Sequence, residues 1–130
     1  MFIAGGIGVA PFLSMVRQTT HEGTPRRISP FYSNRRPEDA PFLAELQELE
    51  GLNSNFQFIP TMTQVFTSQH QWTGETSYLR KDTIAKYVGE LIGPLYYIAG
   101  PPAMVESMQQ KLRDAKVKPD DIFTDEFTGY

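Results

Sequence analysis

Short apolar runs alternate with longer amphipathic stretches along this chain. The apolar runs predict strands at 2–4, 27–33, 56–60 and 95–99 and from Ile122 onward. Helical spacing of apolar residues predicts helices from Pro11 to a stop at Gly23, at 37–50, at 82–88 and from Pro102 onward. Strands that alternate with helices predict an α/β fold with right-handed crossovers. We expect a three-layer α/β/α doubly wound sheet of about five parallel strands, in a single domain over 1–130.

Prolines and glycines set the expected limits of these elements. Pro30 lies in the middle of the 27–33 strand, and a proline there conflicts with a central position because it cannot donate to the ladder. Pro60 is expected to end or bend the third strand, and Gly51 to end the second helix. Residues 61–77 are polar with single aromatics, which predicts a long loop of a kind that is often functional or mobile.

Composition removes several classes of function. A net charge of −3 argues against general binding to nucleic acid. The absence of cysteine excludes disulfides, thiolate catalysis and cysteine-held metal clusters, and it fits a reducing, cytoplasmic location. The apolar runs are much shorter than the roughly 18 residues that a membrane span needs. The two histidines, His21 and His70, lie far apart without other ligands nearby, so no metal site is expected.

The candidate chemistry begins at a glycine-dense turn directly after the first strand. Gly5, Gly6, Ile7 and Gly8 precede Pro11, which suits the first turn of a helix. Glycines allow a sharp turn and a close approach to a ligand, and a helix N-terminus offers free N–H groups to a phosphate. The alternative interpretation is a tight turn that only packs the helix on the strand.

A second turn of this kind follows the fourth strand. Gly100, Pro101 and Pro102 connect that strand to the next helix, which carries Val105, Met108, Leu112 and Ala115 on its buried side. If strands one and four are neighbours, both turns border one crevice at the carboxyl ends of the strands, where doubly wound folds bind ligands.

These segments together resemble one family, the C-terminal NAD(P)-binding domain of the ferredoxin–NADP reductase superfamily of flavoproteins. Residues 3–11 match its G-x-G-x-x-P pyrophosphate turn, and 32–35 match the segment that receives adenosine. Residues 99–104 resemble its C-G-P-P-x-M turn beside the nicotinamide, and 125–130 resemble its C-terminal segment near the flavin. The segments occur in the family's order over essentially the whole chain.

The resemblance implies roles for individual residues. The cofactor-binding residues that it implies are Gly5, Gly6, Ile7, Gly8, Pro11, Ser33, Arg35, Arg36, Thr61, Thr63, Ala99, Gly100, Pro101, Pro102, Met104 and Tyr130. Glu126 and Phe127 would lie at the flavin–nicotinamide contact as catalytic residues; the alternative is a frayed terminus with one buried phenylalanine. Thr61 and Thr63 would lie near the nicotinamide or its ribose, or belong to an ordinary loop.

Two departures from the family pattern affect these expectations. The family's cysteine before Gly-Pro-Pro is Ala99 here, which puts the rate of hydride transfer in doubt rather than binding. The N-terminal flavin-binding barrel with its R-x-Y-[ST] segment is not in these 130 residues, so we expect FAD to reach the site only through a separate domain.

The segment after the second strand bears on the choice of coenzyme. Ser33, Arg35 and Arg36 suit a 2′-phosphate, so NADP(H) is favoured over NAD(H). An NAD-specific site usually carries an acid here; 32–36 contain none, although Glu38 and Asp39 follow closely. The alternatives are a solvated basic turn and an arginine that stacks on adenine.

The resulting hypothesis is the NAD(P)H-binding half of an FAD-dependent oxidoreductase. Such a protein passes hydride from nicotinamide to flavin and on to a one-electron acceptor. The alternatives are a non-catalytic dinucleotide-sensing or scaffold module and an inactive truncated fragment. Expected partners are an FAD-binding domain and a redox protein. Self-association is expected if an apolar patch near Pro101, Phe127 and Tyr130 is exposed.

Overall fold

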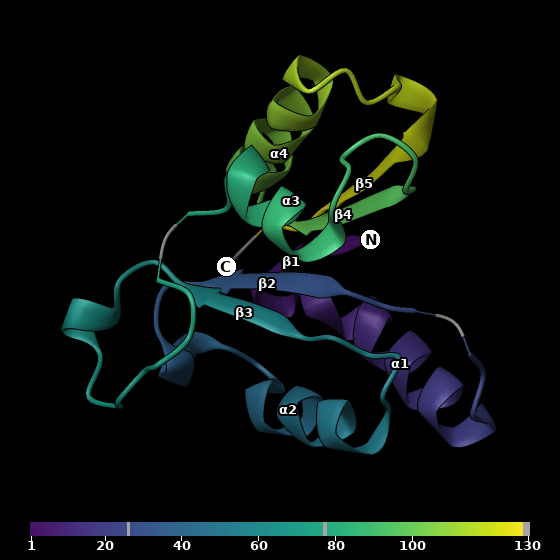
Figure 1. The fold of residues 1–130 in the computed structure, drawn as a ribbon. Coiled ribbons are helices and arrows are strands. Elements are labelled where there is room, and N and C mark those ends of the chain that lie inside the picture. The colour runs from purple at the N-terminus through teal and green to yellow at the C-terminus, as the bar shows by residue number, and fades with distance from the viewer. Residues whose placement is uncertain (26, 77, 129–130) are drawn as a thin grey trace.

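The computed structural model describes residues 1–25, 27–76 and 78–128, and it confirms the predicted α/β class. Parallel strands form one sheet in the order β3-β2-β1-β4-β5 (Figure 1). The strands are β1 (Phe2–Gly5), β2 (Pro30–Asn34), β3 (Ile59–Met62), β4 (Tyr96–Gly100) and β5 (Ile122–Glu126). The chain order reverses between β1 and β4, so these two neighbours mark the topological switch point.

Helices cover both faces of the sheet, and the sheet separates the core into two clusters (Figure 1). Helices α1 (Ala10–Glu22) and α2 (Leu43–Leu52) pack on one face, where Phe12 and Leu46 are buried. Helices α3 (Lys81–Val88) and α4 (Pro102–Asp114) pack on the other face, where Ile84 and Val105 are buried. No helix in the described part of the chain is both long and apolar enough to cross a bilayer.

The ends of α1 agree with its sequence signals. Pro11 lies in the first turn, where the N–H that it lacks would have no intrahelical partner. Gly23 closes the helix in the left-handed region with φ 65°, and its N–H donates to the Thr19 carbonyl. Between these ends Phe12 stacks on Phe2 of β1, with ring centroids 4.3 Å apart, and so fixes the helix on the sheet.

The predicted helix over 37–50 is wrong in its limits. Residues Pro37–Asp39 form a single 3₁₀ turn, and α2 begins only at Leu43. Pro41 excludes the helical conformation for the residue before it, and Ala40 is extended with φ −95° and ψ 100°. Gly51 does not end the helix, which continues to Leu52 and closes when the Asn53 N–H donates to Leu49.

Both problematic prolines lie where a strand tolerates them. Pro30 is the first residue of β2, not its middle. Pro60 does not end β3, which continues to Met62 at the edge of the sheet. The Met62 N–H points away from β2 and donates to the Glu75 carbonyl (2.9 Å). Residues two apart in a strand direct their N–H groups to the same side, so the N–H that Pro60 lacks would also point away from β2.

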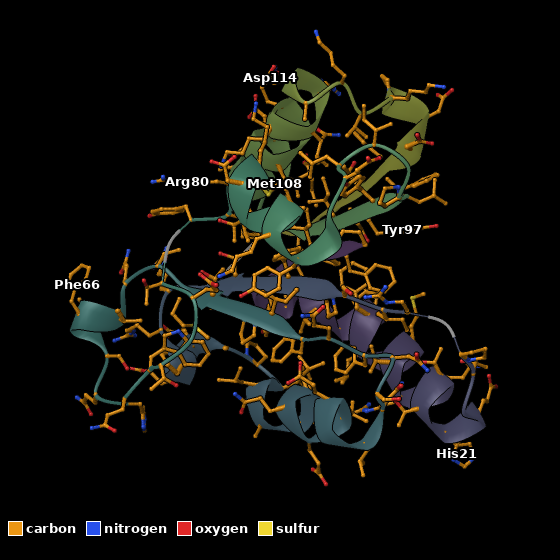
Figure 2. All side chains as sticks on the ribbon, viewed as in Figure 1. His21, Phe66, Arg80, Tyr97, Met108 and Asp114 are labelled. Atoms are coloured by element: carbon orange, nitrogen blue, oxygen red, sulfur yellow. The ribbon has the colours of Figure 1, made fainter. Side chains whose placement is uncertain are left out.

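The long polar loop after β3 is attached at two places. Ser68 donates to the Glu38 carboxylate (2.7 Å), which joins the loop to the segment after β2. Near its other end, the Glu75 carboxylate accepts hydrogen bonds from Tyr87 and Lys86 of α3. Between these anchors Phe66 projects away from the sheet with 84% of its side chain exposed (Figure 2).

Candidate functional site

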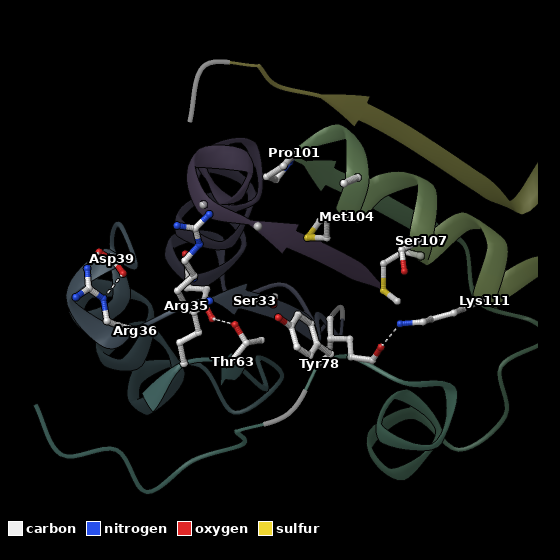
Figure 3. A pocket seen from close by; sticks show the side chains of 17 residues that line it. Ser33, Arg35, Arg36, Asp39, Thr63, Tyr78, Pro101, Met104, Ser107 and Lys111 are labelled. Atoms are coloured by element: carbon white, nitrogen blue, oxygen red, sulfur yellow. Dashed lines mark hydrogen bonds and ion pairs between the residues drawn. The ribbon is translucent and has the colours of Figure 1, made fainter. Parts of the chain in front are cut away.

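A cavity of about 770 Å³ opens at the carboxyl ends of β1, β2 and β3 and along the first turns of α4. Gly5 and Gly6 line it from the first turn, and Pro101 and Met104 line it from the second (Figure 3). The two turns therefore border one crevice beside the switch point. Thr63 and Gln64, after β3, close another side.

The first turn requires glycines for its backbone conformation and for its close packing. Gly6 has φ 56°, which L side chains adopt rarely, and it starts the 3₁₀ turn Gly6–Val9 that leads into α1. A Cβ on Gly5 would lie 2.6 Å from the Met104 sulfur, and a Cβ on Gly8 would lie 2.2 Å from the Ala99 carbonyl oxygen. Gly8 thus packs the turn against β4, while Gly5 and Gly6 lie at the cavity.

A buried tyrosine supports this turn from below. The Tyr32 hydroxyl lies 3.0 Å from the Gly6 carbonyl oxygen and 2.9 Å from the Pro41 carbonyl oxygen. The Tyr32 ring is buried in the core, with its centroid 6.1 Å from that of Phe58. The phenol therefore joins the first turn to the segment that precedes α2.

The second turn is held in place by β5 and the residue that follows it. The Phe127 N–H donates to the Gly100 carbonyl (3.0 Å), and Glu126 pairs in register with Gly100. The Met104 N–H donates to Pro101 and closes the first turn of α4. The C-terminal segment thus runs beside the Gly-Pro-Pro turn, as the resemblance implies.

The basic segment after β2 contains one paired and one unpaired arginine. Arg36 donates to both carboxylate oxygens of Asp39, at 2.7 and 3.0 Å (Figure 3). This bonding holds the pKa of Asp39 below its usual value and raises the pKa of Arg36. Arg35 also lines the cavity, and no carboxylate in the described part of the chain lies within ion-pairing distance of it.

Helix α4 supplies a wall of the cavity that sequence reasoning missed. Ala103, Ser107 and Lys111 recur every four residues and line the cavity beside Met104. The Lys111 ammonium donates to the Leu79 carbonyl (2.8 Å), which fixes it beside Tyr78 (Figure 3). The four-residue spacing of this stripe, next to the buried face of the helix, was the available signal.

The other implied cofactor-binding residues lie outside the lining. Ile7 is 51% exposed, Thr61 is buried within β3, and Ala99 is buried in β4. The positions that support the turns without lining the cavity are Gly8, Pro11, Gly100 and Pro102. Phe127 packs partly buried against the core. Tyr130 lies outside the described residues.

The described residues were compared with the ligand sets that metal ions need. Within residues 1–25, 27–76 and 78–128, no group of three or more histidine, aspartate or glutamate side chains could hold an ion. His21 lies at the far end of α1 (Figure 2). The site therefore offers glycine backbone, guanidinium and hydroxyl groups, which suit a phosphorylated ligand.

A doubly wound sheet with a glycine turn at its switch point and a basic group after β2 defines a dinucleotide-binding domain. The family model of the oxidoreductase NAD-binding domain matches residues 2–110, and the chain belongs to this family. The resemblance to the nucleotide-binding domain of ferredoxin reductases is thereby confirmed.

Relatives of known function are parts of reductases. The chain is 30% identical over 130 residues to the reductase component of propane 2-monooxygenase from Mycolicibacterium goodii, covering 98% of this chain and 37% of that protein. It is 29% identical over 133 residues to a subunit of the Na(+)-translocating NADH-quinone reductase from Pseudomonas paraeruginosa, covering 99% of this chain and 32% of that subunit. The chain thus spans about a third of the length of these relatives.

A solved structure with the same fold is the Amycolatopsis cytochrome P450 reductase GcoB. The superposition has a TM-score of 0.79 with 23% identity, and it covers 98% of this chain and 37% of that one. The similarity extends over the whole five-stranded sheet, and the fold is that of ferredoxin-reductase-like domains.

Proposed function

We propose that this chain is the NAD(P)H-binding half of a flavin-dependent reductase. The observation that carries the proposal is the cavity at the switch point, where the glycine turn faces Arg35 and Met104. Membership of the NAD-binding family and reductase relatives support it. The turn presents backbone N–H groups to a pyrophosphate, and Arg35 places a positive charge at the adenosine end.

The residues of this chain bind and orient, because the cofactors of such reductases carry the redox chemistry. A nicotinamide held at this cavity would supply hydride chemistry, with a flavin of another domain as the acceptor. Glu126 and Phe127 remain predictions as residues of the flavin contact. An FAD-binding domain, a one-electron acceptor, self-association and a cytoplasmic location also remain predictions.

The choice of coenzyme depends on whether Arg35 and Arg36 are available to bind a 2′-phosphate. Asp39 already occupies the guanidinium of Arg36, so we assign the 2′-phosphate to Arg35 alone. One arginine supports a modest preference for NADP(H), whereas the related quinone reductase is named for NADH. We therefore propose a site that binds both coenzymes and favours NADPH by less than about tenfold, a limit set by one solvent-exposed charge contact.

Replacing Asp39 by asparagine should raise the affinity for NADPH. The change removes a negative charge from the cavity and frees the Arg36 guanidinium for the 2′-phosphate. We expect a three- to tenfold tighter Kd for NADPH, on the order of one exposed ion pair, and an unchanged or weaker Kd for NADH. Calorimetric titration with both coenzymes measures the two effects. A variant that tightens neither would show that Arg36 does not reach the 2′-phosphate.

The proposed function is tested by titration of the 130-residue chain with NADPH, NADH and ADP-ribose. Binding of all three below about 1 mM is expected, because their shared pyrophosphate meets the glycine turn. No turnover with a dye acceptor is expected without flavin. Failure of all three ligands to bind at millimolar concentration would contradict the proposal. Reconstitution with a related FAD-binding domain then separates a reductase from a sensing module, since only the reductase gains diaphorase activity.

A further inference from the structure

The outer side of β5 is an open edge of the sheet. β5 is the last strand in the sheet order, next to β4 (Figure 1). The Phe127 N–H points toward β4 and donates to the Gly100 carbonyl. N–H groups two residues apart in a strand point to the same side, so those of Thr124 and Glu126 point away from β4. Both residues are exposed, and within the described part of the chain no strand pairs with this outer side.

An aromatic surface lies beside this edge, on the face of the sheet that α1 covers. Phe2, Tyr97 and Phe123 are neighbours in register across β1, β4 and β5, so their side chains share one face. Phe12 of α1 stacks on Phe2, which is only 7% exposed. Tyr97 and Phe123, nearer the edge, are 39% and 46% exposed and stack with ring centroids 5.0 Å apart. Exposed aromatic rings beside a free strand edge indicate a surface that another polypeptide covers.

Carboxylates flank this edge and restrict what can cover it. Asp120 and Asp121 lie in the turn before β5, and Asp125 and Glu126 lie at its end. None of the four forms an ion pair within the part of the chain that the structure describes. A second copy of the same edge would bring like charges together, and charged residues on an edge strand oppose such self-pairing. Unpaired carboxylates attract a basic strand instead.

We propose that the β5 edge docks an extended basic segment of a partner protein, which adds a sixth strand to the sheet. The main chain of that segment would pair with the outward N–H and C=O groups of Thr124 and Glu126. Phe123 and Asp125 share one face of β5, so an arginine of the segment would stack on the ring and pair with the carboxylate. Such docking does not require a bound nucleotide.

The probe is a synthetic peptide of about seven residues, within the usual length of a strand, that alternates arginine with valine. Titration of the isotope-labelled chain at low salt should shift the amide signals of Thr124 and Glu126 more than those of Phe123 and Asp125. Only the first two N–H groups face the added strand. The half-maximal shift is expected below about 1 mM peptide, and added salt should weaken it. A peptide with glutamate in place of arginine should produce no such shifts.

Three variants separate strand pairing from a general attraction of charges. Thr124→Pro removes one outward N–H at an edge position that tolerates proline, and it should weaken peptide binding by about tenfold or more. Asp125→Lys should weaken binding about three- to tenfold, because an exposed attraction becomes a repulsion. Asp82→Lys makes the same change of charge at an exposed position of α3 and should leave the affinity unchanged within about twofold. Melting temperatures close to that of the wild type would show that the variants fold.

Three results would overturn the proposal. Peptide shifts without alternation along β5, or equal losses of affinity in the Asp125 and Asp82 variants, would mean a diffuse attraction to negative charge. Concentration-dependent shifts of Thr124 and Glu126 without peptide, together with a dimer in sedimentation, would make a second copy the occupant of this edge. The third result is an absence of shifts on β5 at millimolar peptide.

Discussion

Replacing Gly8 by alanine is expected to destabilise the protein by about 3 kcal/mol or more, at the upper end of overpacking effects. The added Cβ would lie 2.2 Å from the Ala99 carbonyl oxygen and 2.9 Å from the Gly100 nitrogen. Both atoms belong to the backbone of β4, which is paired on both sides and cannot move aside cheaply. Thermal unfolding followed by circular dichroism should show a melting temperature lower by about 10 °C or more.

Gly51→Ala is the control for the Gly8 prediction. A Cβ at Gly51 meets nothing within 4 Å, and the residue lies inside α2. Alanine in a helix is more stable than glycine by roughly 0.5–1 kcal/mol, so this variant should melt slightly higher. If the Gly8 variant melted within about 2 °C of the wild type, the close packing of the first turn on β4 would be refuted, since so small a change is well under 1 kcal/mol.

Reversing the charge of Arg35 is expected to weaken NADPH binding by about ten- to a hundredfold, because one exposed attraction to the 2′-phosphate is lost and a repulsion replaces it. Arg35→Glu removes a guanidinium that has no ion pair among the described residues and puts a carboxylate near Asp39 in the cavity. NADH binding should fall less, because NADH lacks the 2′-phosphate. Titration with both coenzymes at two salt concentrations measures the difference, which should shrink at high salt.

Arg27→Glu makes the same change of charge at the opposite end of β2. Arg27 is exposed and precedes the strand, whereas Arg35 follows it. The control should leave the affinity for both coenzymes unchanged within about twofold, as expected for a charge beyond the screening distance. Equal losses for the two arginine variants would mean that overall charge, rather than a contact at the cavity, determines the affinity.

The sequence predicted the two turns at the cavity because each combines strong local signals. A strand, clustered glycines and a proline in the first helical turn predict Gly5–Pro11 without knowledge of the rest of the fold. The alternation of strands with helices then implies a parallel sheet, in which both turns border one crevice if strands one and four are neighbours. The structure agrees with both expectations.

The interactions that the sequence did not reveal depend on packing and on turn geometry. The 3₁₀ turn at Pro37–Asp39 brings Arg36 and Asp39 together, because residues three apart eclipse in such a turn. The cavity wall of Ser107 and Lys111 depends on how α4 is rotated on the sheet, which the spacing of its apolar residues left open. Within the described residues the Asn34 Nδ2 is buried without a hydrogen-bond partner, which depends on how its neighbours pack and has no signal in the sequence.

The most direct test of the nucleotide site is a map of backbone amide shifts on titration with ADP-ribose. The largest shifts are expected at Gly5, Gly6, Asn34, Arg35 and Met104, because the pyrophosphate would meet the first turn and the adenosine the end of β2. Shifts confined to the α2 surface or the exposed end of α1, with these residues unchanged, would contradict the account.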